Sequence, residues 1–137
     1  MRSLHLNAIF GALLLTWGLS TAAAAPVAIT HPGVADASAG DLKNIFLNQK
    51  TTWGNGDRVV LATLKGGATH EAFMKETVSK TASQFKSYWR KLVFTGKAKL
   101  PKAFDSEADL VRFVASTPGA VGYIDDATPH DGVKVVR

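Results

Sequence analysis

The run from Val59 to Leu64 limits the fold more than any other part of the chain, because it is apolar on both of its faces. A strand with this pattern is typical of a sheet that helices cover on both sides. Gly66 and Gly67 follow as a loop, and apolar residues then recur at helical spacing between His70 and Val78. This order of strand, loop and helix predicts an α/β fold.

The rest of the chain alternates strands and helices in the same way. Further strands are expected at 27–31, 120–124 and 133–136, and further helices at 41–47, 85–93 and 110–114. The expected N-caps are Ser38, Thr69, Thr81 and Ser106. Gly122, inside a strand, indicates the close approach of another backbone. Strands separated by helices predict a mainly parallel sheet covered by helices.

The N-terminus has the layout of a secretory signal peptide. Positive charge at the first two residues precedes an apolar block, Ala8–Leu19, and small residues follow it. We expect cleavage after Ala24, which gives a signal peptide, residues 1–24, and one periplasmic or secreted domain, residues 25–137. The alternative is an uncleaved membrane anchor, but the apolar block is shorter than the roughly 18–20 residues of a spanning helix. We therefore expect no transmembrane span after cleavage.

The composition narrows the classes of function. The chain has no cysteine, which excludes disulfides, thiol nucleophiles, iron–sulfur clusters and cysteine-based zinc sites. Its 16 Lys and Arg residues against 11 Asp and Glu give a net charge of +5, so the surface should attract anions. The expected export, and the lack of any helix-turn-helix, RNA-binding or zinc-finger pattern, argue against nucleic acid as a partner.

Four segments together resemble a known protein family. They are Asp41–Lys50 followed by Trp53, then Glu71–Phe73, then Tyr88–Trp89 with Phe94–Gly96, and finally Phe113–Tyr123. In this order they are similar to the second lobe of the phosphate-binding proteins, the periplasmic substrate-binding components of phosphate ABC transporters. The resemblance implies a single lobe of the type 2 periplasmic-binding-protein-like fold, with inorganic phosphate or a related oxyanion as its ligand.

The resemblance also points to a site. Members of the family commonly have a Ser-Gly-Thr-Arg-like element at a helix start, and the matching residues here are Gly67, Ala68, Thr69 and His70. Thr69 keeps its residue type. Gly67 stands in place of the Ser and His70 in place of the Arg.

Elementary chemistry indicates the same place. Free N–H groups at a helix start, the helix dipole, a hydroxyl and nearby cationic or titratable groups converge there, and glycines let an anion approach the backbone. The candidate anion-binding residues are Lys65, Gly66, Gly67, Ala68, Thr69 and His70. The alternative is a tight connection in which Thr69 is only a helix cap. A single lobe would leave the anion half hydrated, so its affinity should be weak.

Metal binding, cofactors and catalysis are not expected. His31, His70 and His130 lack the i, i+4 spacing of a metal site, and the chain has no His-Glu-x-x-His run. It also lacks the Gly-x-Ser-x-Gly elbow that would support a nucleophilic serine.

Aromatic and basic residues offer two further surfaces. The aromatic residues Trp53, Tyr88, Trp89 and Tyr123 could form a binding face, but helical spacing favours burial of Tyr88 and Trp89 in the core. A basic set could dock an acidic partner or anionic lipid, although charged helix faces are usually solvated. This set is Lys86, Arg90, Lys91, Lys97, Lys99 and Lys102.

The sequence thus predicts an exported, non-enzymatic binding protein that resembles a phosphate-transporter substrate-binding component reduced to one lobe. The alternative is a ligand-free interaction module of the cell envelope. In that case the face left by the missing lobe, expected to be apolar, would dock an envelope protein or a second copy of the chain.

Overall fold

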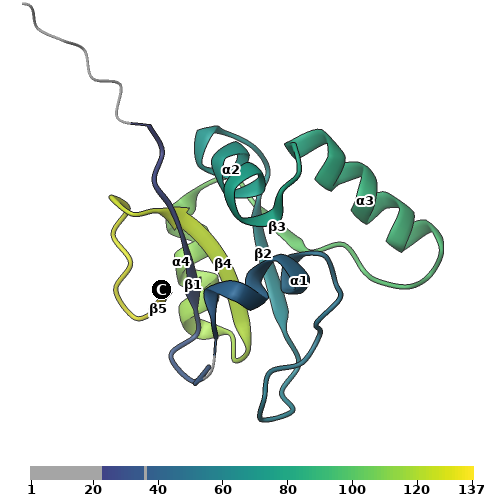
Figure 1. Cartoon of the computed structure of the whole chain (residues 1–137). Coiled ribbons are helices and arrows are strands. Elements are labelled where there is room, and N and C mark those ends of the chain that lie inside the picture. Colours follow the sequence, from purple (N-terminus) through teal and green to yellow (C-terminus); the bar gives the residue numbers. More distant parts are fainter. Residues whose placement is uncertain (1–22, 36) are drawn as a thin grey trace, which may run out of the picture.

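The computed structural model describes residues 23–35 and 37–137 (Figure 1). Most of the predicted signal peptide, residues 1–22, therefore lies outside the described residues. Within the described ranges, no helix is both long and apolar enough to cross a membrane.

A mixed sheet of five strands lies at the centre of the described structure. The strands are β1 (Pro26–Thr30), β2 (Val60–Leu64), β3 (Lys102–Phe104), β4 (Ala120–Asp125) and β5 (Lys134–Val136). Their order in the sheet is β3-β2-β4-β1-β5. β2 pairs in parallel with β3 and β4, whereas β1 is antiparallel to β4 and β5. All strands except β1 thus share one direction, and the predicted α/β fold with a mainly parallel sheet is confirmed.

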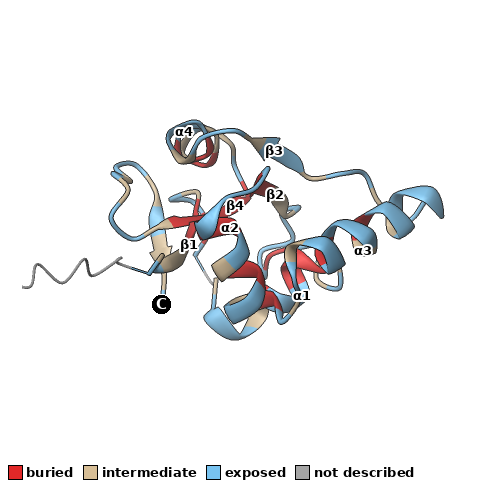
Figure 2. Ribbon diagram, turned by 90° about the horizontal axis from the view of Figure 1, so that it is seen from above, coloured by how far each residue is buried: buried red, intermediate tan, exposed pale blue. Residues whose placement is uncertain are grey.

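Helices cover both faces of this sheet. They are α1 (Leu42–Phe46) after a 3-10 turn η1 (Ala39–Asp41), α2 (Ala68–Phe73) continued by a π-helical turn η2 (Met74–Val78), α3 (Ala82–Phe94) and α4 (Glu107–Ser116). α1, α2 and α3 lie on one side of the sheet and α4 on the other (Figure 2). Because both faces are covered, β4 is buried from Ala120 to Ile124.

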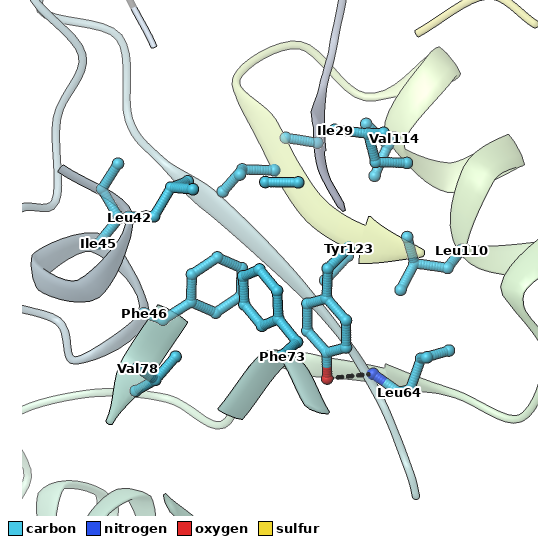
Figure 3. Close-up of a cluster of buried hydrophobic side chains, with 14 of the residues drawn as sticks. Ile29, Leu42, Ile45, Phe46, Leu64, Phe73, Val78, Leu110, Val114 and Tyr123 are labelled. Carbon is cyan, nitrogen blue, oxygen red and sulfur yellow. Dashed lines mark hydrogen bonds between the residues drawn. The ribbon is translucent and has the colours of Figure 1, made fainter. Parts of the chain in front are cut away.

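Aromatic rings fill the core between the sheet and the layer formed by α1, α2 and α3 (Figure 3). Phe73 stacks on Tyr123 with 4.2 Å between ring centroids, and Phe46 meets Phe73 edge-on at 5.0 Å. Trp53 and Trp89 are also buried, each with 3% of its surface exposed. The predicted burial of Trp89 is confirmed, whereas Tyr88, also predicted to be buried, is half-buried. Trp53 and Tyr123, which the sequence offered for a binding face, lie in the core instead.

Two side-chain hydrogen bonds fix α3 to the end of α1. Trp89 Nε1 donates to the main-chain oxygen of Phe46 at 3.0 Å. The hydroxyl of Tyr88, which is half-buried, donates to the main-chain oxygen of Leu47 at 2.6 Å. Both bonds come from residues in the middle of α3. The C-terminal end of the helix therefore extends past the point where it is bonded to α1.

The starts of α3 and α4 have the predicted caps. The Thr81 hydroxyl accepts from the Gln84 N–H, and the Gln84 side chain accepts from the Thr81 N–H, which completes a capping box. The Ser106 hydroxyl accepts from the Asp109 N–H at 3.1 Å.

Two local predictions differ from the structure. The sequence does not predict β3, since its three residues lie inside a basic stretch that shows no strand periodicity. The helical spacing places Val93 on the same face as Trp89, but Val93 is 37% exposed, because it lies in the last turn of α3, after Leu92, which still packs against the core.

Gly122 lies in β4 where α4 and β2 come close to it. A Cβ added there would meet Leu110 Cδ2 at 2.7 Å and the main-chain oxygen of Ala62 at 3.2 Å. The predicted close approach of another backbone is confirmed.

We expect Gly122→Ala to lower the free energy of unfolding by about 1–3 kcal/mol, because the added methyl group overpacks the core. Urea unfolding followed by tryptophan fluorescence measures this. Gly40→Ala is the matched control, since a Cβ at Gly40 meets no atom within 4 Å. A Gly122→Ala variant as stable as the Gly40→Ala variant would contradict the prediction.

Candidate functional site

The candidate loop lies at the carboxyl edge of the three parallel strands. β2 ends at Leu64, β3 at Phe104 and β4 at Asp125. Because these strands are parallel, their ends meet on one edge, which is where α/β sheets commonly place ligands. The Lys65 N–H donates to the main-chain oxygen of Phe104 at 3.0 Å and so holds the start of the loop beside β3.

Gly67 determines where α2 begins. Its φ of 99° and ψ of 175° form a conformation that residues with a side chain rarely adopt. The helix starts at Ala68 with Gly67 as its N-cap, so the prediction that Thr69 caps the helix is wrong. The backbone conformation also gives a physical reason for a glycine where the resembling family has a Ser.

Unpaired backbone donors precede and open this helix. Within the part of the chain that the structure describes, the N–H groups of Gly66, Gly67, Ala68 and Thr69 have no acceptor. The first three residues are exposed, and N–H groups at a helix start carry part of the positive helix dipole. The Lys65 ammonium, on a side chain that is 57% exposed, adds a full positive charge next to them.

Glu107 holds the edge together from the start of α4. Its carboxylate accepts from the Thr69 hydroxyl at 3.2 Å, from the Thr128 hydroxyl at 3.0 Å and from the Asp125 N–H. One side chain thereby joins α2, α4 and the end of β4. The sequence analysis missed Glu107, since its only signal is an acidic residue in the first turn of a helix, which is common.

His70 is buried and bonded to the core. The Leu64 N–H donates to the Tyr123 hydroxyl at 3.0 Å, and His70 Nδ1 is hydrogen-bonded to the same oxygen at 2.5 Å. Burial lowers the pKa of His70, and the nearby charge of Glu71 only partly offsets this. His70 thus lacks the fixed charge of the Arg in whose place it stands.

A cavity of about 630 Å³ opens beside the loop, between α3 and the β2 and β3 strands. Of the six predicted site residues, Lys65, Gly66 and His70 line it, whereas the other three do not. α3 contributes the cationic side chains of Lys86 and Arg90. Glu71 is the acidic residue of the lining, so with Lys65, Lys86 and Arg90 the lining is positive on balance.

The other two described histidines take part in local turns. His31 Nδ1 accepts from the Gly33 N–H at 3.0 Å, and His130 Nδ1 lies 2.7 Å from the main-chain oxygen of Thr128. Among the described residues, no group of three or more His, Asp or Glu side chains is arranged to hold a metal ion.

No protein-family model matches the chain, and no curated protein matches it in sequence. Solved structures match it by fold. A structure from Clostridium perfringens, described as a phosphate ABC transporter substrate-binding protein with bound phosphate, has a TM-score of 0.62 and 20% identity. PstS from Borrelia burgdorferi has a TM-score of 0.61 and 12% identity. An ABC-type phosphate transport receptor from Vibrio cholerae has a TM-score of 0.55 and 13% identity.

The chain has a substrate-binding-protein fold. The three matches cover 83%, 82% and 83% of this chain but 44%, 46% and 46% of the solved ones. The chain therefore spans less than half the length of the substrate-binding proteins that it resembles, as one lobe of such a protein does. The predicted resemblance and fold class are confirmed at the level of the fold.

We expect this substrate-binding-protein fold to lose stability as the pH falls below about 6.5, the usual pKa of histidine in an unfolded chain. Below that pH the unfolded chain takes up a proton at His70, while the folded chain, in which the pKa is lowered, does not. The free energy of unfolding therefore falls until the lowered pKa is reached. Urea unfolding at a series of pH values between about 8 and 4 measures the slope.

His70→Gln should make this slope shallower, because it removes the buried titrating group. His130→Gln, which changes a histidine outside the core, is the control and should keep the original slope. Equal slopes for His70→Gln and the unchanged protein would contradict the prediction.

Proposed function

We propose that the chain is an exported, non-enzymatic binding protein that holds an oxyanion, inorganic phosphate in the first place, at the start of α2. The observation that carries this proposal is the run of unpaired N–H groups from Gly66 to Thr69 beside the Lys65 ammonium. An oxyanion would accept hydrogen bonds from these donors and would be stabilised by the helix dipole. The phosphate in the Clostridium perfringens structure supports phosphate as the first ligand to test.

Lys65 is available to such a ligand. Its ion pair with Asp105 has 57% of the lysine and 81% of the aspartate side chain exposed. Exposed pairs of this kind contribute at most about 1 kcal/mol. An anion at the loop can therefore compete with Asp105 for the ammonium group.

Glu107 affects which oxyanion binds. Its carboxylate contacts the Thr69 hydroxyl, at the end of the run of free N–H groups. A carboxylate in this place repels a fully deprotonated anion but can accept a hydrogen bond from a protonated one. Phosphate keeps a proton at neutral pH and sulfate does not, so we expect phosphate to bind better than sulfate.

The affinity of the chain by itself should be weak. Gly66, Gly67 and Ala68 are exposed, so an anion bound to them keeps water on its outer side. A second chain that supplies the remaining part of a substrate-binding-protein fold would enclose the anion and raise the affinity. We therefore expect millimolar binding by the chain alone and tighter binding with such a partner.

The test is a titration of the exported, purified protein with phosphate and then sulfate, followed through its backbone amide NMR signals. We expect phosphate to shift the amides of Gly66, Gly67, Thr69 and His70 selectively. Lys65→Gln should weaken binding by about threefold, as expected for one exposed charge. Lys43→Gln, which changes an exposed lysine on α1, is the matched control and should leave the affinity unchanged.

Silence of these four amides at millimolar phosphate, in a folded protein and with a partner added, would overturn the proposal. Equal losses for Lys65→Gln and Lys43→Gln would show that phosphate responds to the net charge and not to the loop.

The second proposal is a ligand-free interaction module, and Glu107 is the observation that favours it. The Thr69 hydroxyl already donates its hydrogen bond to the Glu107 carboxylate, and Gly67 has no side chain that could bind an anion. The edge of the sheet is not the apolar face expected from the sequence, because its exposed residues are polar or small. They are Lys65, Gly66, Gly67 and Ala68 after β2, Asp105 and Ser106 after β3, and Asp126 and Ala127 after β4. A partner would meet this edge through hydrogen bonds to the free N–H groups.

Light scattering across a range of protein concentrations tests the self-associating form of this module. We expect dimers at high concentration that Gly66→Pro, which removes one of the free N–H groups, weakens. A protein that stays monomeric and whose loop amides respond to phosphate would favour the anion site and contradict the module.

A further inference from the structure

Positive charge is concentrated in residues 77–104, which we term the basic segment. This stretch holds α3 and the connection to β3, and it contains no Asp or Glu. Its basic residues are Lys80, Lys86, Arg90, Lys91, Lys97, Lys99 and Lys102. Outside the basic segment, acidic residues outnumber basic ones. The net charge of +5 is therefore a local property of one side of the molecule.

The same segment carries the exposed apolar side chains. Among the described residues, the large hydrophobic side chains that are exposed are Phe94 (91%), Leu100 (64%) and Val93 (37%). These three, with Arg90 and Lys91, line one shallow hollow on the surface, so they lie next to each other. We term these five residues the α3 tip.

The fold holds the α3 tip away from the core. The contacts of Trp89 and Tyr88 with the end of α1 anchor the middle of the helix, and the last turns continue outward. The Thr95 hydroxyl donates to the main-chain oxygen of Lys91 at 2.8 Å, and Gly96, with φ of 72°, ends the helix. Figure 1 shows α3 projecting from the side of the molecule, and Figure 2 shows its outer end exposed.

We propose that the α3 tip binds an anionic lipid surface. A phenylalanine that is almost fully exposed, beside a second apolar side chain and within a group of lysines and arginines, is what an interfacial membrane contact requires. The apolar side chains enter the boundary between headgroups and acyl chains, while the cations contact the lipid phosphates. The lipid class that we propose is the anionic phosphodiester lipids, represented by phosphatidylglycerol.

A bilayer fits the α3 tip better than an acidic protein does. Phe94 projects into solvent, and the hollow behind it is shallow and almost wholly apolar. A protein partner would need a pocket shaped for this one ring, whereas a bilayer accepts any protruding apolar side chain. The lysines on both sides of Phe94 in the sequence can reach a flat anionic surface together. The inference is independent of the oxyanion site, because none of the five residues of the α3 tip belongs to the loop.

Co-sedimentation with vesicles tests the inference on the exported, purified protein. One set of vesicles contains phosphatidylcholine alone, and the other contains equal amounts of phosphatidylcholine and phosphatidylglycerol. We expect binding to the anionic vesicles at low salt and at least about tenfold weaker binding to the neutral ones. Raising the salt to physiological strength should weaken binding further without abolishing it, since the apolar contact does not depend on charge.

Two variants separate the parts of the contact. Lys97→Gln/Lys99→Gln, which changes the two lysines that lie between Phe94 and Leu100 of the tip in the sequence, should weaken binding to anionic vesicles by about tenfold or more. Lys43→Gln/Lys75→Gln removes the same charge at exposed positions outside the basic segment and should change binding far less. Phe94→Ser should also weaken binding by about tenfold, because it removes the side chain that enters the bilayer. Since these side chains are exposed, thermal unfolding should show that all variants fold.

Phe94→Trp gives a spectroscopic check. Trp53 and Trp89 are each only 3% exposed, so a new tryptophan at the tip is the one that meets the lipid. Its emission should shift to shorter wavelength with anionic vesicles and stay unchanged with phosphatidylcholine alone.

Three outcomes would overturn the inference. The first is equal binding to both kinds of vesicle, or to neither. The second is an equal loss in the two lysine pairs, which would assign the effect to net charge. The third is binding to soluble polyglutamate that depends on Phe94, together with no binding to vesicles. That result would assign the α3 tip to an acidic protein.

Discussion

The hydroxyl of Tyr123 is the interaction on which the site depends. It accepts from the Leu64 N–H, at the end of β2, and is hydrogen-bonded to the ring of His70, in the first turn of α2. The two ends of the candidate loop are thus held by one oxygen atom, and the Tyr123 ring is fixed by its stack on Phe73 (Figure 3). Lys65, Gly66, Gly67 and Ala68, between these ends, are exposed, and Gly67 adopts a conformation that only glycine readily allows. A rigid core therefore presents a short loop whose N–H groups cannot turn inward to find partners.

Glu107 sets the electrostatics of the same edge. It brings a negative charge to the start of α2, where the helix dipole alone would stabilise an anion from solvent. Three donors from the protein satisfy this carboxylate, so it acts first as a structural tie between α2, α4 and β4. It also leaves the backbone N–H groups and Lys65 as the remaining donors for a ligand. For the oxyanion that we propose as the ligand of the loop, this arrangement favours a protonated form over a fully deprotonated one.

The sequence predicted the layers of the fold because local patterns encode them. The apolar faces of β2 and β4, the capping box at Thr81 and the tight packing at Gly122 all follow from residue type and spacing. It could not predict contacts between distant residues, such as those of Glu107 with Thr69 and Thr128, which only the folded chain brings together. His70 was predicted to bind an anion, but its ring is hydrogen-bonded to Tyr123 on β4, which is again a contact between distant residues. The position of the candidate loop was therefore predictable, whereas its electrostatics were not.

Arg90 connects the two surfaces that attract anions. It lines the cavity next to Lys65 and also belongs to the α3 tip. The positive charge of the basic segment therefore reaches the cavity beside the loop. A free oxyanion near the loop is attracted by this field before it reaches the N–H groups. A negatively charged surface at the tip would neutralise part of the same field. If both proposals hold, an anionic surface bound at the tip therefore lowers the electrostatic attraction of anions to the loop, although the two sites share no loop residue.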